Sequence, residues 1–253
     1  MAAPGHRPMS NIRMSRKVNE VIQADILFWH SDIPIMHILD ECTRYSMLVL
    51  MKDKSTESCC RALKMWWFKI FQPPGLLIVD QEGGLGSDEA GLFLERHDVQ
   101  RRAKATDMHA SMVERHHQLV RNLLNLIQDQ CAEEGIPASK EDILAEVCYA
   151  KNNMLQVGGA HPITAVFGQM PSSLPQMDFE TQSLAMTDDS LGDENNPNRT
   201  CVRLRELAVK AMIEQTARDR VTIANKTQTR RSGQEYGYKT GDLVDIYRKP
   251  EGR

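Results

Sequence analysis

Apolar and β-branched residues recur in three short runs near the start of the chain, VIQADILFW, IPIMHILD and YSMLVLMK. Turn-like breaks at 30–32 and 40–43 separate these runs. Alternation over such short lengths is typical of strands, and the breaks are short enough to join neighbours directly. The pattern therefore predicts a three-stranded meander between Val21 and Asp53.

A helix is predicted to follow the meander. Ser55, Thr56 and Glu57 offer an N-cap and an early acidic residue before the run SCCRALKMWWFKIF, and the proline pair at 73–74 must end the helix. The next run, GLLIVD at 75–80, is short and continuously apolar. Such a run is typical of a strand buried on both faces.

The rest of the first 171 residues alternates between helical and strand patterns. The order βββαβαβαα is not a strict βαβ alternation, so we expect an α/β fold with a mixed five-stranded sheet and helices on both faces. The further expected elements are a helix at 88–97, a strand at 99–104, a long helix at 108–134 and a helix at 140–155.

The C-terminal third has a different composition. Residues 172–200 are polar, acidic and aperiodic, as in a linker, whereas the following segment has helix-forming composition. The last residues contain one strand pattern, which cannot fold alone, so we expect a truncated small β-barrel. The predicted divisions are a basic tail (1–20), a catalytic core (21–171), an acidic linker (172–200), a basic helix (201–230) and a partial β-barrel (236–253).

Composition changes the picture little. The 253 residues are 41% hydrophobic and 26% charged, near globular averages, and no apolar run reaches the length of a membrane span. The six cysteines contain no C-x-x-C pair, which indicates reduced thiols rather than disulfides or a zinc knuckle. We therefore expect a soluble intracellular protein with no zinc.

Charge is unevenly distributed. The formal net charge is -3, yet residues 1–24 sum to +3 and residues 201–253 to +5. Both ends could lie along a phosphate backbone, so weak overall acidity does not exclude a polyanionic partner. Mixed charge is also typical of an ordinary solvated surface.

Three carboxylates stand where a metal-dependent phosphoryl-transfer site needs them. Asp25 lies inside the first strand, Asp80 ends the apolar run GLLIVD, and Glu114 begins the long helix. Ligands bind at the carboxyl edge of such sheets, and paired carboxylates can hold two Mg²⁺ ions. Each acid alone has an ordinary structural interpretation, as a turn ligand, a loop cap or an exposed helix residue. Their combined order favours the metal site.

The residues around these acids resemble a known family. QAD at Asp25, HILDECTRYS, PPGLLIVDQEG, VERHHQLVRNLL and YAKNNMLQVGGAHPITAVFGQMP are similar to the catalytic core of retroelement integrases, the DDE group of gypsy-like and copia-like LTR retrotransposons. YKTGDLVDIYRKP resembles the opening strand of their C-terminal β-barrel. The resemblance covers about residues 20–171 well and 236–250 briefly.

The resemblance implies an RNase H-like fold and metal-dependent DNA cleavage and strand transfer, with two Mg²⁺ or Mn²⁺ ions on Asp25, Asp80 and Glu114. It also implies DNA and a homo-oligomer as partners, and the nucleus, or a cytoplasmic particle before nuclear entry, as location. Basic and polar residues near Glu114 are the candidates for phosphate contact. They are Arg101, Arg102, Lys104, Arg115, Gln118 and Arg121.

An alternative function stays open: a degenerate integrase-derived fragment that binds DNA or protein without cutting. Three departures from the family pattern favour it. They are the altered loop before the third acid, where TDMHASM replaces the usual Pro and Asn-Gly, the truncated β-barrel, and the missing His and Cys zinc module, since only 24 residues precede Asp25. The loop after Asp80, which reads QEGG, also departs from the family pattern. The intact acids favour catalysis.

Overall fold

A computed structural model describes residues 15–30, 32–80, 84–103, 112–168 and 197–226 of the chain. The strands are β1 (Val21–Trp29), β2 (Ile33–Asp40), β3 (Ser46–Leu50), β4 (Leu76–Val79) and β5 (Gln100–Ala103). The helices are α1 (Thr56–Ala62), a π-helical turn η1 (Leu63–Phe68), α2 (Lys69–Phe71), a 3-10 turn η2 (Gly84–Gly86), α3 (Asp88–Glu95), α4 (Met112–Glu134), α5 (Lys140–Met154), α6 (Pro162–Phe167) and α8 (Pro197–Lys226).

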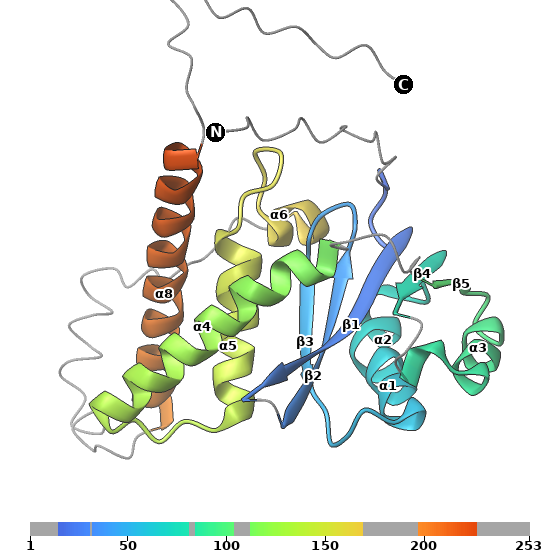
Figure 1. Ribbon diagram of the computed structural model, residues 1–253, viewed down its shortest axis with the longest axis horizontal. Helices are drawn as coiled ribbons and strands as arrows, with labels where there is room; N and C mark the ends of the chain where they lie inside the picture. Colours follow the sequence, from blue (N-terminus) through green and yellow to red (C-terminus); the bar gives the residue numbers. More distant parts are fainter. Residues whose placement is uncertain (1–14, 31, 81–83, 104–111, 169–196, 227–253) are drawn as a thin grey trace, which may run out of the picture. The chain divides into compact units, whose positions relative to one another are not determined.

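The five strands form one mixed sheet in the order β3-β2-β1-β4-β5 (Figure 1). β1, β2 and β3 pair antiparallel, as the predicted meander requires, whereas β4 joins β1 in parallel and β5 joins β4 in parallel. The predicted mixed five-stranded sheet flanked by helices is therefore confirmed, together with the C-terminal helix.

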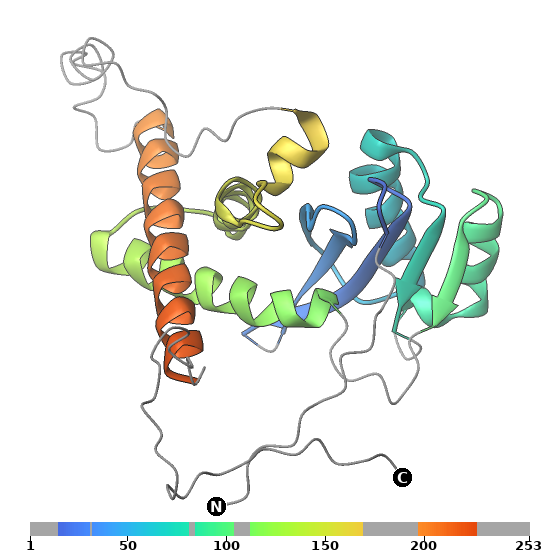
Figure 2. The ribbon, with the colours of Figure 1, turned by 90° about the horizontal axis from the view of Figure 1, so that it is seen from above.

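Helices cover both faces of the sheet (Figure 2). Side chains alternate along each strand, so β1 sends Ile22 and Ala24 to one face and Leu27 and Trp29 to the other. The first face packs against α1, η1 and α3, and the second against α4, α5 and the part of α8 before Thr216. The second cluster includes Leu27, Trp29, Ile35, Val120, Leu123, Leu124, Ile127, Ile143, Val147, Leu204, Leu207 and Met212.

Two expectations about burial and boundaries are corrected. β4 is not buried on both faces: Leu77 and Val79 are buried but Leu76 and Ile78 are only partly covered. The reason is that β4 pairs in the sheet with the exposed edge strand β5, so few of the described residues cover the second face of β4. The C-terminal helix begins at Pro197, inside the segment expected to be linker, while the predicted strand at 236–253 and residues 227–230 lie outside the described residues.

The helix predicted after Ser55 forms, with Ser55 as its N-cap, but its middle turn is π-helical. Adjacent residues of a helix point in different directions, so that Trp67 is buried and Trp66 is half exposed. Trp67 and Phe68 therefore belong to the core, whereas the exposed Trp66 does not.

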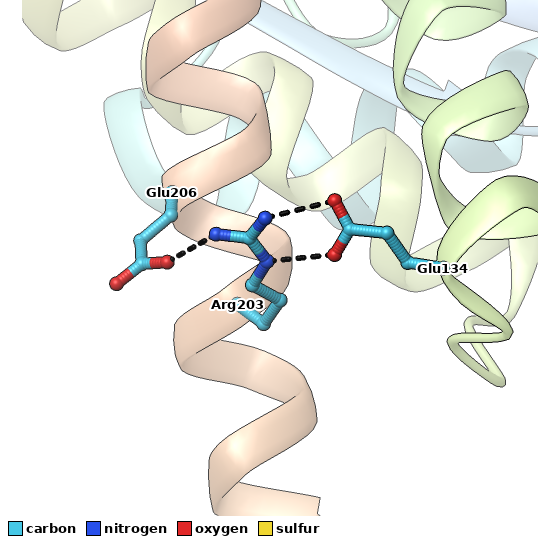
Figure 3. Close-up of polar contacts among 3 residues, drawn as sticks. All are labelled: Glu134, Arg203 and Glu206. Atoms are coloured by element: carbon cyan, nitrogen blue, oxygen red, sulfur yellow. Dashed lines mark hydrogen bonds and ion pairs between the residues drawn. The ribbon is translucent and has the colours of Figure 1, made fainter.

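The first half of α8 is held by apolar packing and by two arginines. The Arg203 guanidinium donates to both carboxylate oxygens of Glu134 on α4, each at 2.8 Å, and to Glu206 at 2.7 Å (Figure 3). Arg205 binds Glu146 of α5 in the same bidentate way and lies 4.1 Å over the ring of Tyr149. Exposed ion pairs contribute little energy, so the buried leucines supply most of the attachment and the arginines fix its register.

Helix α5 covers the outer edge of β3. The side-chain amide of Asn152 accepts from the Ser46 N–H and donates to the Ser46 carbonyl, both at 2.8 Å. Cys148 Sγ donates to the same carbonyl, and the Lys151 ammonium donates to the Ser46 hydroxyl. These side chains replace the strand that would otherwise pair with this edge. Lys151 is fully buried, and this burial lowers the pKa of its amine to about 7.

Asn19 joins the turn before β1 to the end of α2. It has a positive φ of 62°, its N–H donates to Asp40 Oδ1, and its side-chain Nδ2 donates to the carbonyls of Phe71 and Gln72. Its Oδ1 accepts the indole N–H of the buried Trp67 at 2.8 Å. Asparagine suits this position because it tolerates the left-handed region better than other side chains.

We predict that Asn19→Ala lowers the free energy of unfolding by about 2–4 kcal/mol, because three hydrogen bonds are lost and alanine is strained at positive φ. Asn19→Gly loses the same bonds without the strain, so its loss should be about 1 kcal/mol smaller. Urea unfolding of the three proteins measures both values. Equal stability of the wild type and the alanine variant would contradict this account.

A second prediction concerns pH. Between about pH 7 and 10.5 the unfolded chain holds the Lys151 proton and the folded chain does not, so this residue makes stability rise with pH. Lys151→Met should remove a slope of about 1.4 kcal/mol per pH unit, measured by urea unfolding between pH 7.5 and 8.5.

The exposed Lys64 provides the control, because Lys64→Met should leave the pH slope unchanged. If the stability curves of the wild type and Lys151→Met ran parallel across this window, Lys151 would not be buried as described.

Candidate metal and nucleic-acid site

Asp25 lies in the middle of β1, on the face that packs against α4. Its neighbours at alternate positions, Gln23 and Leu27, point to the same face and are buried. Asp25 itself is only partly buried, and its Oδ1 accepts the N–H of Ile26 at 2.8 Å. The strand therefore holds a carboxylate at the boundary between core and solvent.

Asp80 is placed beside Asp25 by the pairing of β1 with β4. The parallel register pairs Ala24 with Val79, so Asp25, in the middle of β1, lies level with Asp80, the residue directly after β4. Both aspartates line one cavity of about 10 Å³. A space of this size holds about one water molecule or ion.

Glu114 lies in the first turn of α4, which borders this cavity. Val113, the residue before it, lines the cavity together with the two aspartates, so the first turn of α4 lies directly against the sheet edge. Glu114 is partly buried. A carboxylate in the first turn is favoured by the helix dipole.

The residues present fit a hard divalent cation. Mg²⁺ binds through one or two carboxylates and keeps several waters, which matches the two aspartates at this small cavity. Within the described ranges, however, no three or more His, Cys, Asp or Glu side chains form a group that could hold a metal. The structure thus brings Asp25 and Asp80 together and the Glu114 helix beside them, but does not gather all three carboxylates.

The candidate phosphate contacts fall into two groups. Arg115, Gln118 and Arg121 are exposed on α4, and Arg102 is exposed on β5. Arg101 has a structural contact as well, because its guanidinium donates to the carbonyls of Leu85 and Ser87 before α3. Lys104 lies outside the described residues.

A buried histidine cluster was missed by the sequence analysis. His37 of β2 pairs across the ladder with Asp25, and its ring lies 5.4 Å from that of His117 and 6.5 Å from that of His116. Its Nε2 lies 3.0 Å from the Ser46 hydroxyl. Because the turn at 30–32 sets the register of β1 and β2, this pairing could have been found by counting from the turn.

Two of the three histidines, His37 and His116, are uncharged at neutral pH because their pKa values are lowered. Burial, reinforced by nearby Lys151, lowers the pKa of His37 well below its usual value and lowers the pKa of His116 to about 3. The same cations that act on His116 include Arg44 and Arg115, so positive charge gathers on this side of α4. Neutral imidazoles can therefore pack beside the helix without adding to that charge.

Gln23 was quoted in the QAD motif but given no role. It is buried, it lines the same cavity as the aspartates, and its side chain is hydrogen-bonded to Glu41, the residue after β2, and to Val113 of α4. Nothing in the strand pattern marks it, because a polar residue at this position also suits an ordinary strand.

None of the helices that the structure describes is long and apolar enough to cross a bilayer.

Comparison with known proteins identifies similar folds among solved structures. No family model matches the chain, and no curated protein matches it in sequence. The magnesium complex of the HTLV-2 integrase catalytic core domain, in its dimeric form, is similar in structure, with a TM-score of 0.50 and 14% identity over 60% of this chain and 97% of that one.

A chain of the simian T-cell lymphotropic virus intasome in complex with PP2A regulatory subunit B56 gamma is similar with a TM-score of 0.54 and 13% identity. That match covers 68% of this chain and 65% of the other. At this identity the likeness concerns the fold alone: the chain has the fold of a retroviral integrase catalytic core, which is RNase H-like.

Proposed function

We propose that this protein is an integrase-like polynucleotidyl transferase, which cuts and joins DNA strands to integrate retroelement DNA of the gypsy-like or copia-like type. One observation carries the proposal: Asp25 in the middle of β1 and Asp80 directly after β4 line one cavity together with Val113 in the first turn of α4. An integrase-like fold supports it.

In this proposal Asp25, Asp80 and Glu114 form a DDE triad. Two Mg²⁺ or Mn²⁺ ions, when bound, would stabilise charge on the attacking and leaving oxygens of an in-line displacement. Asp25 and Asp80 would hold the ions on the rigid sheet, and Glu114 would complete the ligand set from α4. Water or a DNA 3′-hydroxyl attacks the phosphodiester phosphorus, the bond to the leaving oxygen breaks, and no covalent enzyme intermediate forms.

The basic side chains would place the DNA. Arg115 is exposed directly beside Glu114, and Arg121 is exposed two turns further along α4. Such contacts bind the phosphate backbone without reading sequence, and their contribution falls with salt. We further propose a homo-oligomer, since the similar HTLV-2 core is described in dimeric form, and a nuclear location or a cytoplasmic particle before nuclear entry.

One observation favours the second candidate, a fragment that binds DNA or protein without cutting. The three carboxylates are not gathered as a metal-binding group in the parts of the chain that the structure describes. DNA and metal would have to draw Glu114 toward the aspartates for catalysis, whereas a binding module would need no such movement.

The test compares three variants of the full chain on a radiolabelled DNA end with Mn²⁺ or Mg²⁺. Glu114→Gln should lower strand cleavage or joining at least about a hundredfold, because a lost metal ligand removes several kcal/mol of transition-state stabilisation. Its DNA affinity should stay nearly unchanged. Glu133→Gln, an exposed acid at the far end of the same helix, is the matched control and should keep full activity.

Arg121→Ala should instead weaken DNA binding and reduce the slope of log affinity against log salt by about 0.9. A wild-type chain that binds DNA but shows no turnover with either metal would favour the binding module. Metal-dependent cleavage that survives Glu114→Gln would contradict both candidates, since it would place the chemistry on other residues.

A further inference from the structure

The first turn of α4 is fixed by a side chain from β1. The first four N–H groups of any helix have no carbonyl partner within the helix, and Val113 is the second residue of α4. Its N–H donates to Oε1 of Gln23 at 3.2 Å, a contact between residues 90 positions apart in the sequence. Because Val113 is only 3% exposed, water cannot easily replace this acceptor.

The nitrogen of the Gln23 side-chain amide also has a hydrogen-bond partner. Its Nε2 donates to Oε2 of Glu41 at 3.4 Å, and the other oxygen of Glu41 accepts the N–H of Ser15. Glu41 is buried, and its own N–H donates to the Val21 carbonyl, which ties it to the start of β1. Only one orientation of the amide places its oxygen toward an N–H and its nitrogen toward a carboxylate.

This bridge joins the two elements that carry the acids. Gln23 lies two residues before Asp25 on the same face of β1, and Val113 lies immediately before Glu114. Gln23 and Val113 both line the cavity that Asp25 and Asp80 share. A shift of the helix start would therefore change the distance between Glu114 and the aspartates.

We propose that Gln23 is a positioning residue, which sets the place of Glu114 relative to Asp25 by holding the Val113 N–H from one end and Glu41 from the other. This inference rests on the proposed function. In this role Gln23 acts through α4 and is not itself a metal ligand. Loss of the bridge leaves the buried Val113 N–H without its acceptor and removes one of the donors to the Glu41 carboxylate, so the first turn loosens.

The first measurement is amide hydrogen exchange by NMR, which reports the contact without activity. In Gln23→Leu, which is similar in size but cannot hydrogen-bond, the Val113 amide should exchange at least about tenfold faster. The Val120 amide, in the middle of the same helix, should stay protected and serves as the internal control.

The second measurement is turnover on the DNA end. Gln23→Leu should lower kcat about tenfold or more and raise the Mn²⁺ concentration needed for half-maximal activity, because misplacement of about 1 Å already costs rate. KM for DNA should stay within about twofold, since the phosphate contacts are unchanged. A merely structural role would lower the melting temperature and leave kcat unchanged well below it.

Variants that exchange the amide and the carboxylate between positions 23 and 41 keep the positioning role testable if Gln23→Leu folds poorly. Gln23→Glu places two carboxylates together and should lose activity, whereas Glu41→Gln keeps an acceptor for Gln23 and should be mild. In the double variant Q23E/E41Q the amide at 41 donates to the carboxylate at 23, which still accepts from Val113. Activity should return to within about threefold of the wild type.

The outcomes separate the two proposals. Unchanged Val113 exchange in Gln23→Leu, a wild-type kcat despite faster exchange, or a double variant as inactive as Gln23→Glu would each overturn the positioning role. A wild-type chain with no metal-dependent turnover would overturn the proposed function itself, and with it any role for Gln23 in catalysis.

Discussion

The parallel pairing of β1 with β4 is the constraint on which the candidate site depends. Antiparallel neighbours would place the ends of the two strands at opposite edges of the sheet, whereas Ala24 pairs with Val79 and the chain direction is shared. Asp25, in the middle of β1, and Asp80, directly after β4, therefore lie close together without any special loop. A parallel connection needs a crossover, and the α1-η1-α2 segment supplies it on the face opposite α4.

The second requirement is a fixed start for α4, and polar side chains provide it. Gln23, which is bonded to Glu41, accepts the N–H of Val113, and the ring of His37 packs against that of His117 about one turn further along α4. His37 is linked in turn to Ser46, which Asn152 and Lys151 bind from α5. Burying these polar side chains costs free energy, which their hydrogen bonds offset only in this one arrangement. They therefore make the arrangement specific rather than adding much to its stability.

Most of the fold could be predicted from the sequence because its signals are local. Alternation between Val21 and Leu50, the Ser55 cap and the proline pair set the elements and their order. The positions of Asp25 and Asp80 then followed from where their strands lie and end. These are properties of one strand or one turn, and they need no knowledge of distant contacts.

The parts that could not be predicted depend on pairs far apart in the sequence. The contacts of Gln23 with Val113 and of Ser46 with Asn152 join residues 90 and 106 positions apart. The half-covered second face of β4 depends on what packs nearby, which a run of apolar letters does not reveal. The π-helical turn over Leu63–Phe68 is likewise not marked by any local signal in the sequence.

Paramagnetic broadening by Mn²⁺ tests the central claim most directly. In the amide NMR spectrum of the isotope-labelled chain, substoichiometric Mn²⁺ should first broaden the signals of Asp25, Asp80 and the Val113–Glu114 turn, and Asp80→Asn should abolish this effect. Broadening centred on other acids, such as Asp40 and Glu41, or no broadening at all, would show that this edge of the sheet does not hold the metal.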